Sequence, residues 1–250
     1  MLRPTELAQF TASMPARYGH TFDAIAIAQH ARTAHLRQGR PVSVGRFTSA
    51  GQAGSPLCVV APDRPGFLAL VSLAFVSCDL DVVAAEVFTR KDKFGTDEAV
   101  DLFWVRRQSS LDTGLLRPRE LRQLRATLTK LWHQSPQELR YAPAASPSNS
   151  AATGAVVRFL ENAAGNLVIL EIETSDRCGL LLGLCRALFG QGVQIIGSRI
   201  QVNEGRIHGR FEIVEESHRP IALERRRVIK HAVISAVDQL ANEATERLAG

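Results

Sequence analysis

The chain has 250 residues, of which 45% are hydrophobic and 22% are charged, and its formal net charge is +5. This composition is typical of a globular protein of one or two domains. No apolar run approaches the length of about 18 residues that a membrane-spanning helix needs. The arginines are interspersed with acidic residues, which argues against a nucleic-acid partner. The first residues contain no apolar stretch typical of a signal peptide, so we expect a cytoplasmic protein.

Cysteines and histidines give no sign of a metal or redox centre. The four cysteines form no CxxC pair, and no histidine has a partner at metal-ligand spacing. We expect the cysteines to be small buried hydrophobic residues. A glycine-rich phosphate loop and the common hydrolase motifs are also missing from the sequence. We therefore predict no catalytic residue, no metal and no cofactor.

In chain order, residues 1–52 are expected to form a short helical segment, too small to be a domain. A strand, a helix, two strands joined by a hairpin and an amphipathic helix follow. Asp63 and Pro65 mark the start of the first of these helices, with Asp63 as the expected N-cap. Residues 135–154 are rich in proline, serine and alanine and are predicted to be a flexible linker.

A short strand at residues 155–160 follows the linker, and we assign it to the first domain as its closing strand. The first domain is then 53–134 plus 155–160. The second domain, 161–250, repeats the order of strand, helix, two strands and a long final helix. No strand is left to close the second sheet. We expect the final helix or a partner to cover that edge.

The two domains share one motif at a constant spacing. Asp63 and Asp176 are 113 residues apart, and so are Gly66 and Gly179. The match extends through the following helix and strand, as in APDRPGFLALVSLAF and TSDRCGLLLGLCRAL. A constant offset across two types of element indicates that one supersecondary unit was duplicated.

A strand that leads through a D-x-x-G turn into a helix, followed by two strands and a helix, resembles the ACT domain. The segments VRFLENAAGNLVILEIETSDRCGLL and GVQIIGSRIQVNEGRI are similar to the tandem ACT region that ends the bifunctional PII uridylyltransferase/uridylyl-removing enzymes. The resemblance covers nearly the whole chain. It implies an α+β fold of two ferredoxin-like βαββαβ units with antiparallel sheets, preceded by a short helical segment.

The catalytic motifs of those enzymes are missing from this sequence. A nucleotidyltransferase needs Gly-Ser followed by Asp-x-Asp to hold Mg²⁺ on a nucleotide. Asp79-Leu80-Asp81 has the second pattern, but no Gly-Ser precedes it at a useful distance. The hydrolase half needs an adjacent His-Asp pair, which this chain lacks. We therefore predict a protein that is not an enzyme.

Each D-R-x-G turn has groups that match the two ends of an amino acid. The glycine lets a ligand approach the main chain, and the first N–H groups of the helix suit a carboxylate. The aspartate suits an ammonium group. The resemblance implies a ligand between paired domains, touching the second strand of the neighbour. The predicted ligand-binding residues are Asp63, Arg64, Gly66, Phe67, Leu68, Val82, Val83, Asp176, Arg177, Gly179, Leu180, Leu181, Gln194 and Ile195.

Simpler roles for the same residues stay open at this point. Asp63 and Asp176 could act only as helix caps, worth about 1 kcal/mol each, and Arg64 and Arg177 could be ordinary exposed side chains. Cys178 stands where the usual turn has proline, which leaves the geometry of the second turn less defined. Side chains of the chain itself filling both turns would contradict a ligand-binding role.

The resulting hypothesis is a non-catalytic regulatory protein that binds a small amino acid, glutamine first by resemblance, and signals nitrogen status to another protein. Two alternatives stay open. The chain could be a fragment or detached regulatory subunit of a PII uridylyltransferase system, working on a separate catalytic chain. It could also be a scaffold that forms homo-oligomers through its sheet edges without a ligand.

Overall fold

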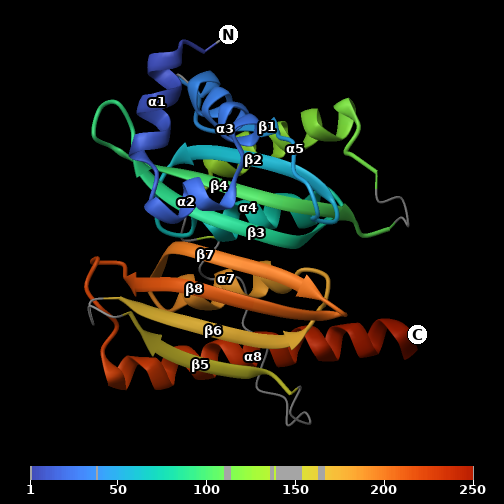
Figure 1. Ribbon diagram of the computed structural model, residues 1–250. Helices are drawn as coiled ribbons and strands as arrows, with labels where there is room; N and C mark the ends of the chain where they lie inside the picture. The colour runs from blue at the N-terminus through green and yellow to red at the C-terminus, as the bar shows by residue number, and fades with distance from the viewer. Residues whose placement is uncertain are drawn as a thin grey trace.

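A single antiparallel sheet of eight strands organises the protein (Figure 1). The computed structural model describes residues 2–37, 39–109, 114–135, 138, 154–162 and 167–249. Nearly all of the predicted linker lies outside these ranges. The strand order is β1-β2-β4-β3-β7-β8-β6-β5, so the sheet consists of two four-stranded halves side by side. This arrangement confirms the predicted α+β class with two ferredoxin-like units.

Three helices come before the sheet, and the same series of elements then occurs twice. The N-terminal helices are α1 (Pro4–Ser13), α2 (Ala16–Thr21) and α3 (Ala24–Leu36). The first unit contains β1 (Ser43–Arg46), β2 (Ser55–Pro62), α4 (Phe67–Ser77), β3 (Leu80–Lys91), β4 (Asp97–Arg107) and α5 (Pro118–Trp132). The second contains β5 (Val156–Glu161), β6 (Val168–Ser175), α7 (Leu180–Gly190), β7 (Val193–Asn203), β8 (Arg206–Glu215) and α8 (Leu223–Ala249).

Strand β5 corrects the predicted domain boundaries. We assigned it to the first unit, but it pairs with β6 from Val156↔Glu173 to Glu161↔Val168. The assignment was wrong because β5 and β6 are neighbours in the chain, and such strands usually pair as hairpins. In the first unit β1 takes the equivalent place beside β2. Each unit therefore runs ββαββα along the chain, and β5 covers the sheet edge that we expected a helix or partner to cover.

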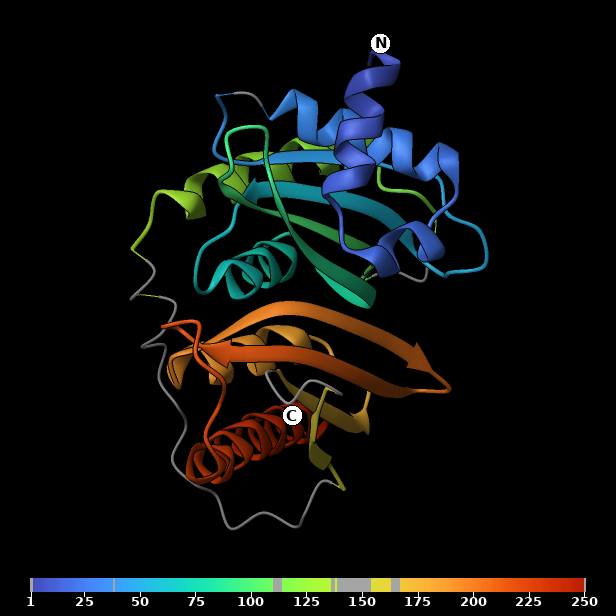
Figure 2. The same ribbon diagram turned by 60° about the vertical axis from the view of Figure 1, so that its left-hand side comes forward.

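The two faces of the sheet are covered differently. Helices α4, α5, α7 and α8 lie on one face, and α1–α3 lie on the other face of the first unit only (Figure 2). Strand β2 is therefore buried on both sides, with Val59 in the core below α4 and Val60 in the core below α1–α3. Apart from Ser55 its sequence is apolar, as expected for a strand without a solvent face. Strand β8 alternates between exposed and buried residues because its outer face is open.

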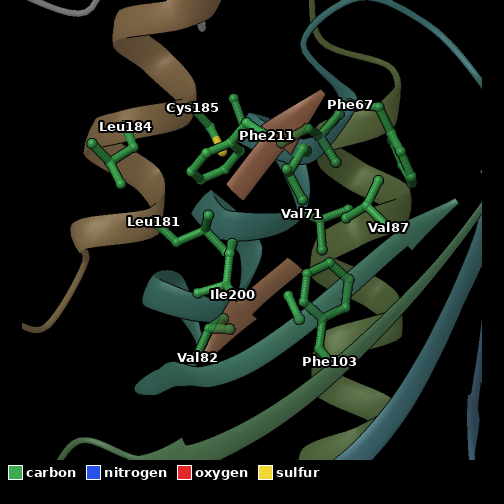
Figure 3. Close-up of a cluster of buried hydrophobic side chains, with 14 of the residues drawn as sticks. Phe67, Val71, Val82, Val87, Phe103, Leu181, Leu184, Cys185, Ile200 and Phe211 are labelled. Carbon is green, nitrogen blue, oxygen red and sulfur yellow. The ribbon is translucent and has the colours of Figure 1, made fainter. Parts of the chain in front are cut away.

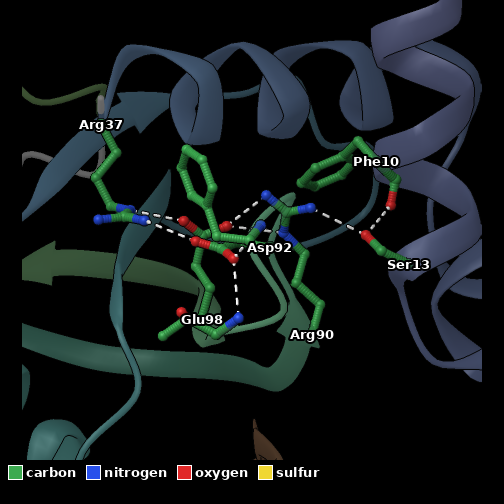
Figure 4. Close-up of polar contacts among 8 residues, drawn as sticks. Phe10, Ser13, Arg37, Arg90, Asp92 and Glu98 are labelled. Atoms are coloured by element: carbon green, nitrogen blue, oxygen red, sulfur yellow. Dashed lines mark hydrogen bonds and ion pairs between the residues drawn. The ribbon is translucent and has the colours of Figure 1, made fainter. Parts of the chain in front are cut away.

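The N-terminal helices are fastened to the β3–β4 hairpin by charged residues (Figure 4). Arg37 Nε lies 2.6 Å from Glu98 Oε1, and Arg90 Nε donates to the other oxygen of Glu98 at 2.8 Å. Arg90 also donates to Ser13 Oγ at 2.9 Å and stacks over the ring of Phe10. Because Glu98 is only 2% exposed, these pairs are well shielded from solvent. Helix α1 and the end of α3 are thus bound to the first unit by buried polar contacts.

The units join where β3 and β7 pair antiparallel, from Ala84↔Gln201 to Val87↔Ser198. We call this junction the seam. Below it one apolar core runs through both units, and Figure 3 shows Val82 of β3 close to Leu181 and Ile200 of the second unit. The seam places each D-R-x-G turn beside the neighbouring unit.

Candidate functional site

The two D-R-x-G turns lie near opposite ends of the seam. We call the turn Asp63–Gly66, with the residues of α7 and β7 that face it, the first corner. The turn Asp176–Gly179, with the β3 and β4 residues that face it, is the second corner. The duplicated motif therefore produces two related sites, each built from both units.

Glycine, not aspartate, stands at the N-cap of each helix. Helix α4 begins at Phe67 and α7 at Leu180, after Gly66 with φ = 77° and Gly179 with φ = 76°. Neither N-cap has a side-chain hydrogen bond, so the predicted capping by the aspartates was wrong. The left-handed turn inserts residues between aspartate and helix, which frees the carboxylate for other contacts. The first N–H of each helix, on Phe67 or Leu180, donates to the carbonyl of Arg64 or Arg177 at 3.1 Å. The next N–H groups, on Leu68 and Leu181, point out of the helix without a helical acceptor.

The arginine of each turn contacts the last helix of the same unit. Arg64 stacks on the ring of Trp132 at 3.9 Å from the centroid and donates to the Trp132 carbonyl at 3.0 Å. Arg177 donates to the Val237 carbonyl at 3.4 Å. Burial lowers the pKa of Arg64. Both arginines thus hold the turns in place.

The first corner encloses a cavity of about 20 Å³, lined by Gly66, Leu68, Asp101, Phe189 and Gln194 among others. A cavity of this size has room for about one water molecule. Phe189 narrows it, because its ring lies 2.7 Å from the position that a Cβ on Gly66 would take. An amino acid can enter this corner only if Phe189 moves.

Buried acceptors surround the first corner. Asp63 accepts a hydrogen bond from Thr89 Oγ1 at 2.8 Å, and burial raises the pKa of Asp63 against the effect of that bond. Asp101 is 1% exposed, and burial raises its pKa well above its usual value. Asp101 Oδ1 and Gln194 Oε1 are buried without a hydrogen-bond partner in the described part of the chain. The corner is thus rich in groups that accept hydrogen bonds from a cation.

The second corner is filled by an ion-pair network. Arg106 Nη2 donates to Asp176 Oδ2 at 2.7 Å and to Asp81 Oδ2 at 2.8 Å. The other oxygen of Asp81 accepts from the Gly179 N–H at 3.4 Å. Burial raises the pKa of Asp81, and the contact with Arg106 opposes that rise. No comparable cation contacts Asp63 among the described residues.

The structure brings one set of predicted residues together and separates another. Seven line the first corner, namely Asp63, Arg64, Gly66, Phe67, Leu68, Gln194 and Ile195. Asp176 and Gly179 meet the neighbouring unit at the second corner, where Arg177, Leu180 and Leu181 belong to the same turn and helix start. Val82 lies in the shared core, and Val83 lies in the cluster below α1–α3. The structure therefore does not bring Val83 to a corner.

Sequence reasoning missed Asp81, Arg106, Asp101 and Phe189. The repeat could have identified Asp81, because the offset of 113 residues makes Asp81, and not Val82, the equivalent of Gln194. Asp81 was considered only as part of a metal-binding pattern. The described residues contain no cluster of three or more side chains that could hold a metal ion.

Two other predictions concern cysteines and membranes. Cys58 and Cys185 are buried as expected, and Cys78 is half-buried. Cys178 is exposed, since it precedes the helix rather than lying within it. In the described part of the chain, no helix combines the length and apolar character needed to cross a membrane.

Two ferredoxin-like units thus share one sheet, and the strand-to-helix turn of each faces the other unit. The chain is 26% identical over 237 residues to the bifunctional uridylyltransferase/uridylyl-removing enzyme of Phenylobacterium zucineum, covering 94% of this chain and 25% of the enzyme. It is 28% identical over 191 residues to the enzyme of that name from Azospirillum brasilense, and this match covers 73% of this chain and 20% of the enzyme. The enzyme of that name from Caulobacter vibrioides is 26% identical over 195 residues, and this match covers 76% of this chain and 20% of the enzyme.

These matches make the chain a distant homologue of a region of those enzymes. The chain spans only about a quarter of the length of the Phenylobacterium enzyme and a fifth of the other two. No family model matches the sequence.

Proposed function

We propose that this protein is a non-catalytic regulatory module that binds a small amino acid at the first corner. The supporting observation is the pair of unpartnered buried atoms there, Asp101 Oδ1 and Gln194 Oε1. A buried polar atom without a hydrogen bond costs about 1–3 kcal/mol. A ligand that donates hydrogen bonds at this point would remove that cost.

The chemistry of the corner matches both ends of a zwitterion. The ammonium group would lie beside Asp63 and Asp101, whose carboxyl groups are buried. The carboxylate would meet the first turn of α4, where the Leu68 N–H and the helix dipole favour an anion. We expect L-glutamine first, because the resemblance implies it and because the Gln194 side chain can exchange hydrogen bonds with another amide.

Binding at this position would act on the seam. The ligand would contact the turn of the first unit and strand β7 of the second, and only four residue pairs join β3 to β7. It would therefore stabilise one orientation of the two units. We propose that a separate catalytic or signalling protein, of the kind that the relatives' uridylyltransferase name suggests, reads this orientation.

A scaffold without a ligand is the second candidate. It is favoured by the small volume of the first corner and by the filled second corner. The two candidates differ in one measurable property, which is stabilisation by a free amino acid.

The test is a thermal-shift screen of the full chain against the twenty amino acids. A ligand at 100 times its Kd adds about 2.7 kcal/mol to the free energy of unfolding, so L-glutamine should raise the melting temperature by several degrees. Asp63→Asn should abolish the shift, whereas Asp176→Asn should retain it relative to its own baseline. A screen without any shift would favour the scaffold. Uridylylation of purified PII protein by this chain with UTP and Mg²⁺ would overturn the non-catalytic assignment.

A further inference from the structure

We propose that the second corner binds no ligand because Asp81 and Arg106 of the chain itself occupy it as a built-in zwitterion. Each chain would then have one amino-acid site, at the first corner. The ion pair at the second corner follows from the geometry alone, whereas the expectation of one ligand site per chain rests on the proposed function.

The two charges lie where the two ends of an amino acid would lie. The guanidinium of Arg106 contacts Asp176 at 2.7 Å, in the place that an ammonium group would take. The Asp81 carboxylate accepts from the Gly179 N–H at the start of α7, in the place of a ligand carboxylate. A 2.8 Å ion pair joins the two side chains, so the cation and the anion form one connected group.

The equivalent positions in the first corner are neutral. Asp81 pairs with Arg106 across β3 and β4, as Gln194 pairs with Val214 across β7 and β8. The duplicated frame therefore carries a charged pair at one corner and an amide with an apolar side chain at the other. This difference explains why the second aspartate has a cation, whereas the amide oxygen of Gln194 has no hydrogen-bond partner among the described residues.

The neighbouring helices show the same asymmetry. The Phe189 ring lies 2.7 Å from the position of a Cβ on Gly66. Its counterpart Val76 lies 4.0 Å from the position of a Cβ on Gly179. The smaller side chain leaves room at the second turn, and the ion pair extends into that region. An aromatic ring thus narrows the first corner, whereas an ion pair fills the second.

A free amino acid would displace this pair only at high cost. Asp81 is 6% exposed, and the side chain of Asp176 is 10% exposed. Expelling Arg106, whose side chain is 39% exposed, would leave these two buried carboxylates to be neutralised by the single ammonium group of the ligand. Breaking a buried pair by removing one partner is strongly destabilising, because the remaining charge is uncompensated. The contacts of the ligand would have to offset this penalty.

The closure can be tested without a ligand by a double-mutant cycle on the full chain. Arg106→Gln and Asp176→Asn should each lower the urea midpoint, and the double variant should be no less stable than Arg106→Gln alone. The control cycle combines Arg106→Gln with Asp63→Asn at the other corner, where the two effects should add. Additive effects in the first cycle would overturn the proposal.

The number of sites is measured by isothermal titration calorimetry with L-glutamine. We expect one ligand per chain, lost in Asp63→Asn and retained in Asp176→Asn. Two ligands per chain, or a single one lost in Asp176→Asn, would refute the closed second corner while leaving an amino-acid function intact. Absence of binding in every variant would refute the amino-acid function, and the double-mutant cycle would still decide whether the ion pair closes the corner.

A transplant provides the matched control. Gln194→Asp combined with Val214→Arg installs the ion pair at the first corner and should abolish binding in a chain that keeps its circular dichroism spectrum. Unchanged binding in that folded variant would show that such a pair does not exclude a ligand. If the variant does not fold, the ligand count of the unmodified chain decides.

Discussion

Gly66 and Gly179 have the same backbone conformation but different surroundings. Both lie in the left-handed region, where a side chain costs about 1–2 kcal/mol. A Cβ on Gly66 would also lie 2.7 Å from the Phe189 ring, whereas a Cβ on Gly179 would have no neighbour closer than 4.0 Å. The same substitution at the two positions therefore separates backbone strain from a steric clash across the seam.

We predict that Gly179→Ala lowers the free energy of unfolding by about 1 kcal/mol, the cost of the left-handed conformation alone. Gly66→Ala should cost clearly more, because the Phe189 ring must shift. Urea denaturation of both variants measures the difference. Equal losses would show that Phe189 yields freely and does not close the first corner.

The second residue-scale prediction concerns Asp101, whose pKa is raised by burial. In the unfolded chain an aspartate has a pKa of about 3.9, so between that value and the higher folded value the native state binds more protons. Stability therefore falls as pH rises through this window, and the cost is complete above the folded pKa. Asp101→Asn should melt higher than the unmodified chain at pH 8 and differ little near pH 3.5. A lower melting temperature at pH 8 would mean that the ionised carboxylate stabilises the fold.

At the scale of elements, sequence periodicity located most helices and strands but not all their partners. The strand at 156–161 was expected, yet its own residues do not specify which strand it pairs with, and it was assigned to the wrong unit. Strand β1 has only four residues and was absorbed into the helical segment. The turns of both corners were predictable because the repeat marks them. The Asp81–Arg106 pair was not predictable from the sequence. Its two residues are 25 positions apart, and their contact with the turn of the other unit depends on the tertiary fold.

The place of β5 leads to a third prediction. Val157 is 4% exposed and packs into the shared core, whereas Val156 is 37% exposed on the open face. Val157→Ala should lower the free energy of unfolding by about 1–2 kcal/mol through lost apolar burial and the resulting cavity. Val156→Ala should change it by less than about 0.5 kcal/mol. Urea denaturation compares the two, and equal effects would place β5 outside the second unit's core.

At the scale of the whole molecule, the seam joins two units that share one core. Glu86 on β3 is 6% exposed and contacts Arg17 of α2 at 3.3 Å and Arg199 of β7 at 2.5 Å. One buried carboxylate thus links the N-terminal helices, the first unit and the second unit. Below it, apolar residues of α4 and α7 belong to the same cluster. Neither unit can separate without exposing this surface to water, which couples their stabilities.

We therefore predict that the chain unfolds in a single calorimetric transition, with equal calorimetric and van't Hoff enthalpies. Ile200 lies at the seam, is 2% exposed and pairs with Ala85. Ile200→Asp places a charge in the shared core and should divide the transition into two, one for each unit, because the coupling is lost while each unit keeps its own strands and helices. Val228→Asp on the exposed side of α8, where the valine is 49% exposed, is the matched control and should leave one transition. A single transition in Ile200→Asp, merely shifted to lower temperature, would show that the two units do not fold independently, and a ligand at the first corner would then act on stability rather than on their orientation.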